Sequence, residues 1–110
     1  MIGIKGIGIY LPNNQLSNFD RMKQFDMNED FVRKKIGFTK LIRKDTNQET
    51  SDLCVNAWNN LNQSYPIVKD EIDCLLVCSQ NPDGYGLPHT SAILHKKINL
   101  PESCAVFDIS

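Results

Sequence analysis

Residues 72–79, Ile-Asp-Cys-Leu-Leu-Val-Cys-Ser, contain the longest strictly apolar run of the chain, from Cys74 to Cys78. The run has the length of a strand, and its continuous apolar character predicts burial on both faces, as in a parallel sheet. A second apolar strand is predicted over 103–110, and a helix from Thr90 to about Ile98 lies between the two. Strands connected through a helix favour an α/β fold with at least partly parallel strands.

A longer amphipathic helix precedes this pair of strands. Thr50 or Ser51 is expected to cap it, and Tyr65-Pro66 to end it. Its apolar residues recur at the spacing of a buried helical stripe: Leu53, Cys54, Ala57, Trp58 and Leu61. Residues 81–88 form a loop rich in glycine and proline.

The N-terminal residues show an imperfect alternation of isoleucine with glycine and lysine. It predicts a strand over 2–9 with a bulge or kink at Gly6, followed by a turn over 11–14. The glycines Gly3, Gly6 and Gly8 follow the order G-x-x-G-x-G within that strand, not at a strand-to-helix turn. Close packing of the backbone is therefore favoured over a phosphate-binding loop.

Two short helices are predicted next. Ser17 is expected to cap the first, which has an apolar face of Phe19, Met22 and Phe25. Asn28 is expected to cap the second, which ends at Gly37 and turns inward Phe31, Val32 and Ile36. Residues 38–49 are predicted to be a loop or a short hairpin.

The composition bounds the class of protein. The chain has 110 residues, with 12 Lys and Arg against 13 Asp and Glu and a net charge of −1. This length suits one compact domain, and the near-zero charge argues against a general nucleic-acid or membrane-surface binder. The sequence shows no signal peptide and no run of the roughly 20 apolar residues that a bilayer needs, so a cytoplasmic location is expected.

Cysteine and histidine spacing does not point to a metal or disulfide site. Cys74 and Cys78 are four strand steps apart, about 13 Å, which exceeds the reach of one disulfide or one zinc ion. The four cysteines are expected to be buried, reduced thiols. His89 and His95 are six residues apart, on different sides of a helix, and each is expected at the surface or in a capping role.

Six basic residues without an intervening acid lie between positions 33 and 44. They form either a solvated helix end and loop, or a surface for a phosphorylated ligand or an acidic partner. Phe31 stands four residues before Lys35, so the two share a face of a helix. An aromatic ring beside an ammonium group suits an adenine ring with a nearby phosphate.

Six segments in order resemble the N-terminal part of the β-ketoacyl-acyl-carrier-protein synthase III family, in the thiolase superfamily. Residues 7–12 are similar to the family's G-x-G-x-Y-L-P start, 29–37 to D-E-W-I-x-x-R-T-G, and 49–53 to E-T-x-S-D-L. Residues 73–79 are similar to I-D-x-I-I-V-A-T, 81–92 to T-P-D-x-x-F-P-S-T-A, and 105–110 to A-F-D-I-S. Each match alone is weak, but together they span the chain.

The resemblance implies a layered α-β-α-β-α fold with a mixed, partly parallel sheet, of which residues 1–110 are an incomplete N-terminal portion. It implies an acyltransferase that condenses an acyl thioester with malonyl-acyl carrier protein, by decarboxylation, in fatty-acid or related acyl-chain biosynthesis. In that family the nucleophilic cysteine follows A-F-D-I-S, and the catalytic His and Asn lie further on. No catalytic residue is therefore expected within the chain, and the 110 residues alone are expected to be inactive.

The resemblance also places binding residues. The family's adenine-stacking aromatic falls at Phe31 and the neighbouring Arg at Lys35, where Trp and Arg are usual. The aromatic at the floor of the acyl pocket, contributed across the dimer, falls at Leu87, which leaves room for a larger or branched primer. Coenzyme A enters as a thioester substrate, and no cofactor or metal is implied. The implied partners are acyl-CoA or acyl carrier protein and a second subunit, with neither nucleic acid nor membrane.

Two other functions stay open at this point. The chain could be a non-catalytic α/β module that docks an acidic carrier protein through residues 33–44. A nucleic-acid binder is the weakest hypothesis, because only Phe31 and Phe38 supply nearby aromatic rings for base stacking.

Overall fold

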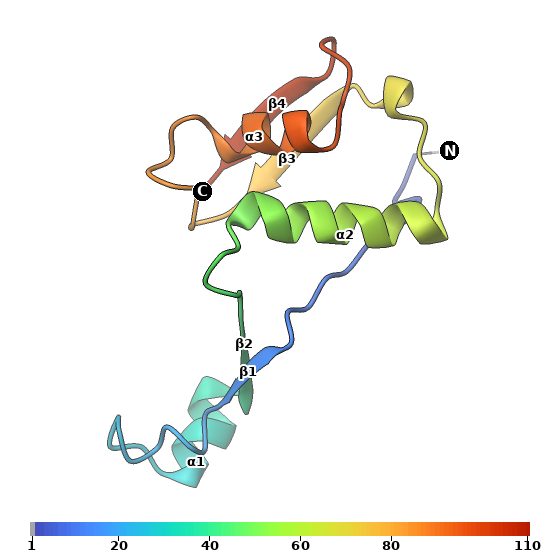
Figure 1. Ribbon diagram of the computed structural model, residues 1–110. Helices are drawn as coiled ribbons and strands as arrows, with labels where there is room; N and C mark the ends of the chain where they lie inside the picture. The colour runs from blue at the N-terminus through green and yellow to red at the C-terminus, as the bar shows by residue number, and fades with distance from the viewer. Residues whose placement is uncertain (1) are drawn as a thin grey trace. The chain divides into compact units, whose positions relative to one another are not determined.

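A parallel pair of strands with a helix between them organises the C-terminal half of the chain (Figure 1). The computed structural model describes residues 2–110. Strand β3 (Cys74–Cys78) pairs in parallel with β4 (Ala105–Ile109), and Leu76 lies opposite Phe107. Helix α3 (Thr90–Lys97) contacts both strands. The predicted strand-helix-strand order is confirmed, because a parallel pair needs such a crossover.

Helix α2 (Thr50–Ser64) lies beside α3. Its cap is Glu49, not Thr50 or Ser51 as predicted, because Glu49 and Asp52 form a reciprocal capping box. The helix ends before Tyr65, as predicted. A short 3-10 turn, η2 (Lys69–Glu71), then leads to β3.

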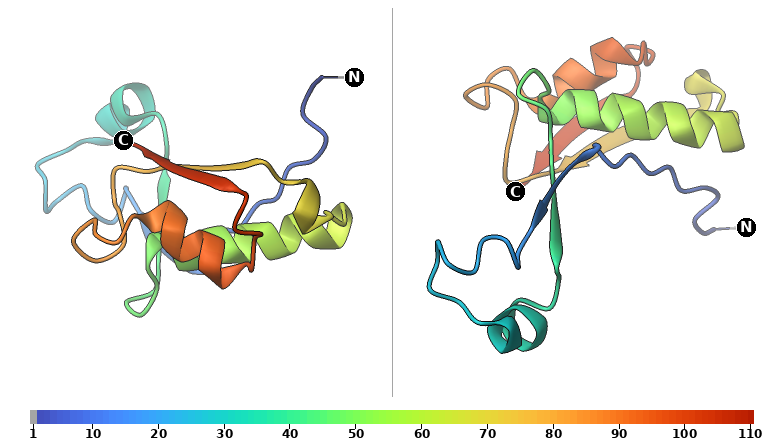
Figure 2. Two further views of the ribbon diagram at one scale, coloured as in Figure 1. Left: turned by 90° about the horizontal axis from the view of Figure 1, so that it is seen from above. Right: turned by 60° about the horizontal axis from the view of Figure 1, so that its bottom comes forward.

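The hydrophobic core lies between β3 and the two helices. Its buried members are Val77, Leu94, Ile98, Leu100 and Cys104, and the α2 side chains Cys54, Val55 and Trp58 pack against them. The prediction that β3 is buried on both faces is wrong, since Leu76 is 59% exposed. Successive strand residues point to opposite faces, and the helices cover only the face of Leu75 and Val77 in the described part of the chain (Figure 2).

Residues 2–10 form an extended segment that follows α2, not the predicted bulged strand. A strand needs a hydrogen-bonded neighbour, and residues 2–110 supply none to this segment. Its contact is with the helix: the Ile9 amide donates to Asn60 Oδ1 at 2.9 Å. A Cβ on Gly8 would overlap the carbonyl oxygen of Ala57, so the predicted close backbone approach is confirmed, with a helix as the neighbour.

The chain divides into two compact units. The α/β unit comprises the residues before Leu11 together with Asn47–Ser110, and the small unit is Leu11–Thr46. The prediction that the whole chain is one incomplete domain stays a prediction.

The small unit is built on an antiparallel pair, β1 (Asn14–Ser17) with β2 (Lys40–Arg43). The predicted turn over 11–14 is wrong at its end, because Asn14 already pairs with Arg43. The expected loop or hairpin over 38–49 instead contains β2, whose partner β1 lies more than twenty residues upstream. Such long-range pairing leaves no local signal in the sequence.

The two predicted short helices differ in outcome. The first predicted helix is absent, since residues 18–26 form turns. The Ser17 hydroxyl accepts hydrogen bonds from the amides of Phe19 and Asp20 and so closes a turn. The second helix exists as α1 (Glu29–Phe31), continued by a π-helical turn, η1 (Val32–Ile36). Asn28 Oδ1 caps it, and Gly37 ends it in the left-handed conformation at φ 80°, both as predicted.

The cysteines differ from the expectation of burial. All four are free thiols, and only Cys104 is buried. Cys54 is partly covered, whereas Cys74 and Cys78 are exposed because they lie on the uncovered face of β3. No helix within residues 2–110 is long and apolar enough to span a membrane.

Candidate functional site

The carboxyl ends of β3 and β4 meet beside the N-terminus of α3, which is where α/β sheets hold ligands. A cavity of about 430 Å³ lies at this edge. It is lined by Val77, Ser79, Gln80, Pro82, Gly86, His89, Thr90, Asp108 and Ser110. Most of these residues are polar, and they come from both strand ends and the intervening loop. The last residues of β4 thus reach the rim of the site.

Asp108 ties β4 to α3. Its two carboxylate oxygens accept the amides of Thr90 at 2.9 Å and Ser91 at 2.8 Å, the first two of the helix. These groups have no partner inside a helix, and the positive end of the helix dipole favours a carboxylate there. Burial alone would raise the pKa of Asp108, but the hydrogen bonds from Ser91 and Thr90 and the nearby His89 hold it below its usual value.

His89 precedes α3 and lines the same cavity. Its Nδ1 atom is 3.5 Å from Asp108 Oδ2, and its side chain is 67% exposed. The predicted surface or capping role is therefore confirmed in position, although the capping carboxylate comes from Asp108. His95 has a local role, since its Nε2 lies 3.0 Å from the carbonyl oxygen of Pro101.

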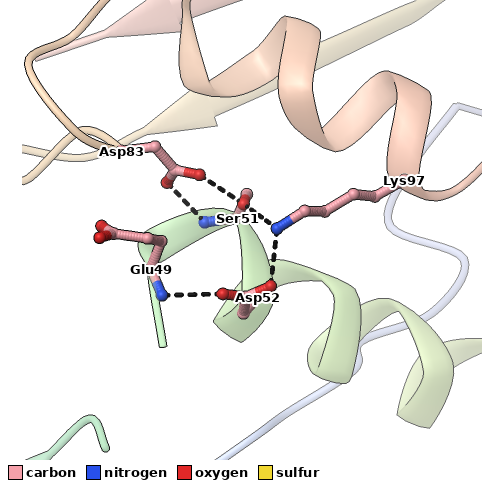
Figure 3. Close-up of polar contacts among 5 residues, drawn as sticks. All are labelled: Glu49, Ser51, Asp52, Asp83 and Lys97. Atoms are coloured by element: carbon pink, nitrogen blue, oxygen red, sulfur yellow. Dashed lines mark hydrogen bonds and ion pairs between the residues drawn. The ribbon is translucent and has the colours of Figure 1, made fainter. Parts of the chain in front are cut away.

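A second aspartate, Asp83, performs the same task for α2 (Figure 3). It is only 6% exposed, and its carboxylate accepts the Ser51 amide at 2.8 Å and the Ser51 hydroxyl at 2.5 Å. Its own amide donates to Thr90 Oγ1 at 2.9 Å. One residue thereby joins the loop after β3 to the first turns of both α2 and α3.

Lys97 closes this network from the far end of α3 (Figure 3). Its ammonium group donates to Ser51 Oγ at 2.7 Å and to Asp52 Oδ1 at 2.6 Å. Asp52 in turn accepts the amide of Glu49 at 2.8 Å. Two hydrogen bonds in sequence, from Lys97 to the Ser51 hydroxyl and from that hydroxyl to Asp83, therefore connect the ammonium group with the buried carboxylate.

The loop after Asp83 carries the predicted pocket residue Leu87, which is 77% exposed. Tyr85 beside it is fully exposed at 104%. Gly84 and Gly86 have φ values of 50° and 85°, a region that glycine adopts readily. The loop thus presents two large side chains to solvent.

Phe31 and Lys35 lie on the surface of the small unit. Phe31 is 46% exposed, so the expectation that it points inward is wrong; Val32, at 0% exposure, is the side chain that α1 and η1 bury. Lys35 is exposed and forms no ion pair within residues 2–110. Both residues are therefore accessible to a ligand, as their predicted binding role requires.

Part of the basic stretch is neutralised by acids that precede it. Arg33 pairs with Glu29 at 2.8 Å and Lys34 pairs with Asp30 at 2.9 Å, each one helical turn upstream. Both acids lie before the stretch 33–44, so the count of acids within that stretch did not include them. Their spacing of four residues from Arg33 and Lys34 is the sequence signal for the two ion pairs. Lys35 thus differs from its two basic neighbours in keeping an uncompensated charge.

Two thiols of the α/β unit, Cys54 and Cys104, do not resemble an activated nucleophile. Burial raises the pKa of Cys54, with the charge of Asp83 as a further cause. Burial likewise raises the pKa of Cys104, and Cys74 and Asp73 add to the effect. A reactive cysteine needs a lowered pKa, because the thiolate is the nucleophile.

The sheet, helices and loops are those of a thiolase-like α/β fold. The chain superposes on β-ketoacyl-[acyl carrier protein] synthase III from Thermus thermophilus with a TM-score of 0.83 and 23% identity, over 97% of this chain and 32% of that one. A 3-oxoacyl-(acyl-carrier protein) synthase from Burkholderia xenovorans gives 0.75 and 28%, over 94% and 31%. The predicted α/β, thiolase-like fold class is confirmed.

The resemblance to β-ketoacyl-acyl-carrier-protein synthase III is confirmed by sequence as well. The chain is 32% identical over 107 residues to β-ketoacyl-[acyl-carrier-protein] synthase III 2 of Bacillus subtilis, covering 97% of this chain and 32% of that protein. It is 29% identical over 106 residues to the synthase III of Neisseria meningitidis serogroup B. The chain spans about a third of the length of the relatives it matches. No protein-family model matches it.

Proposed function

We propose that the chain is the N-terminal third of a 3-oxoacyl-acyl-carrier-protein synthase III-like acyltransferase. The observation that carries this proposal is the match of nearly the whole chain to such synthases in sequence and in fold. The polar cavity at the carboxyl ends of β3 and β4 supports it, because this is the edge at which α/β sheets hold ligands. The comparisons do not favour a non-catalytic carrier-docking module.

The proposed reaction has two steps. A cysteine thiolate attacks the acyl thioester and displaces the carrier thiol, which leaves an acyl-enzyme. A malonyl thioester then loses CO₂, and the resulting enolate attacks the acyl carbonyl, giving a 3-ketoacyl thioester and freeing the cysteine. Residues 2–110 contribute binding groups and structural support in this scheme, and the 110-residue chain alone has no condensing activity.

Phe31 and Lys35 are the proposed contacts for the acyl donor, an acyl-CoA or acyl carrier protein. The exposed ring of Phe31 can stack on adenine, and the uncompensated ammonium group of Lys35 can meet a phosphate. Phe offers a smaller ring than Trp, and Lys lacks the bidentate fork of Arg. Coenzyme A takes part as a thioester substrate, and the chemistry requires no resident cofactor.

Leu87 is the proposed floor of the acyl pocket of a partner subunit in a homodimer. Its exposure on the loop tip fits a side chain that is covered only by a second copy. A leucine fills less space than an aromatic ring, so a larger or branched primer is expected. The cytoplasmic location expected from the sequence stays a prediction.

The test is steady-state kinetics of the full-length protein with acyl and malonyl thioesters. Phe31→Ala and Lys35→Ala should each raise KM for the acyl donor more than they lower kcat, because neither residue contacts the reacting carbon. The Lys35→Ala effect should shrink as salt screens the exposed charge. Phe25→Ala and Lys69→Ala are matched controls, since Phe25 is 50% exposed like Phe31 and Lys69 lies outside the basic stretch.

Unchanged KM in both test variants would remove the donor-binding role. Absence of any 3-ketoacyl product from the full-length protein would remove the condensing activity itself. Condensation by the isolated 110-residue chain would contradict the proposal that these residues alone have no condensing activity.

A further inference from the structure

The loop from Gly84 to Pro88 is fixed at both ends although its middle is exposed. At its start, Asp83 is bonded to the first turns of α2 and α3. At its end, the Thr90 amide is bonded to Asp108 on β4. Within the loop, the Gly86 amide donates to the Asp83 carbonyl at 2.9 Å, a bond that again leads back to the start. The position of the tip therefore depends on its two anchors.

Asp83 is the more demanding anchor, because it is a buried carboxylate without a direct ion pair to any residue from 2 to 110. The positive end of the α2 dipole and two hydrogen bonds from Ser51 stabilise its charge. The oxygen of the Ser51 hydroxyl accepts a hydrogen bond from Lys97, and its hydrogen is donated to Asp83. Asparagine at position 83 would offer one acceptor oxygen where aspartate offers two, so either the amide or the hydroxyl of Ser51 would lose its acceptor.

We propose that Asp83 is the positioning residue of the 84–88 loop, and that the Asp83–Ser51–Lys97 network fixes where Tyr85 and Leu87 stand. A cap that served only α2 would use its carboxylate alone. Asp83 also commits its backbone amide to Thr90 and its carbonyl oxygen to Gly86. The loop and the starts of both helices thus share one residue.

The consequence for specificity rests on the function proposed above. If Leu87 forms the floor of the partner's acyl pocket, the accuracy with which Asp83 holds the loop sets the size of that pocket. Loosening the anchor is then expected to alter the preference between straight and branched acyl groups more than the overall rate.

The first experiment measures the loop without any assay of activity. In the full-length protein, Asp83→Asn should raise the amide exchange rate of Gly86 and the rate of chymotryptic cleavage after Tyr85 by about tenfold. Asp70→Asn is the matched control, because Asp70 is an exposed aspartate in η2 without contact to the loop. Global unfolding is measured alongside, so that local and global opening are separated.

A second variant tests the network from its other end. Lys97→Met removes the donor to Ser51 Oγ and leaves Asp83 in place, so it should also raise the Gly86 exchange rate, by less than Asp83→Asn does. Lys96→Met is the matched control, because Lys96 is an exposed neighbour on α3. Faster exchange in Lys97→Met than in Lys96→Met, beyond the change in global unfolding, supports the network, and equal exchange would remove Lys97 from it. Unchanged exchange in Asp83→Asn, or faster exchange only in proportion to global unfolding, would overturn the proposal.

The second experiment compares kcat/KM for straight and branched acyl thioesters in the same variants. A changed ratio in Asp83→Asn, with Asp70→Asn unaltered, supports the specificity role, and an unchanged ratio in an active enzyme overturns that role. A protein with no condensing activity would refute the proposed function instead, and the exchange data would still decide whether Asp83 positions the loop.

Discussion

The α/β unit and the small unit differ in what they bury and in how much positive charge they carry. The α/β unit buries a small apolar cluster beside β3 and anchors both helix starts with aspartates from distant segments. The small unit buries Val32 but leaves Phe25, Phe31 and Phe38 about half exposed. It also holds eight of the chain's 12 basic residues and five of its 13 acidic ones. Exposed aromatic rings and most of the positive charge of the chain therefore occur together in the small unit.

The largest expected effect tests the core of the α/β unit. Leu94 is 5% exposed in the centre of the cluster, so Leu94→Ala should lower the free energy of unfolding by about 2–5 kcal/mol. Denaturant unfolding of the variant and the original protein measures the difference. A loss below about 1 kcal/mol would show that this cluster is not the main source of stability.

The next effect tests the close approach of the N-terminal segment to α2. Gly8→Ala places a methyl group against Ala57 and Leu61 and should cost about 1–3 kcal/mol of stability. Gly3→Ala is the matched control, because no atom lies within 4 Å of a Cβ at that position. Equal stabilities of the two variants would refute the packing of this segment on the helix.

A smaller effect tests the aspartate cap of α3 through its pH dependence. The pKa of Asp108 is lowered in the folded protein, so its contribution is fully present above the unfolded pKa of about 4 and is lost as the pH falls through the folded value. Asp108→Asn should therefore cost about 1–2 kcal/mol at neutral pH, and the difference should narrow below about pH 4. Unfolding curves of both proteins from neutral to acidic pH measure it; a constant difference would contradict the role of the charge.

The smallest expected effect concerns the exposed ring of the small unit. Phe31→Ala should change stability by no more than about 0.5–1 kcal/mol, because nearly half of the side chain is already in contact with water. Val32→Ala, at the neighbouring position of 0% exposure, should cost more, about 1.5–2 kcal/mol for the lost methyl groups. A reversed order in thermal or denaturant unfolding would show that Phe31 belongs to the core and not to a binding surface.

Local patterns predicted much of the backbone. The apolar run at Cys74–Cys78, the stripe on α2, the Asn28 cap and the Gly37 stop all identify elements that the structure contains. Each of these signals depends on residues within one or two turns of each other. The predictions of a strand over residues 2–9 and of a helix over 19–25 are wrong, although the local patterns fit them. In both segments the backbone conformation depends on which hydrogen-bond partners the rest of the fold supplies.

The candidate site was predicted less completely. Phe31, Lys35 and Leu87 were assigned through the family resemblance, and the structure shows only that all three are exposed. Asp83 and Asp108 lay within the quoted motifs, but their bonds to Ser51 and Thr90 span 32 and 18 residues. No periodicity or spacing rule connects side chains at such distances.

The sequence by itself determined helix α2, the parallel strand pair with its connecting helix, and the family that the chain resembles. Hydrophobic periodicity and capping residues act over a few positions, so they can be recognised in the sequence alone. Only the tertiary structure decided which face of β3 is covered, which aromatic rings stay accessible, and which aspartates hold the helix starts. Those outcomes depend on atoms that folding brings together from distant parts of the chain, where burial and hydrogen bonding are satisfied jointly.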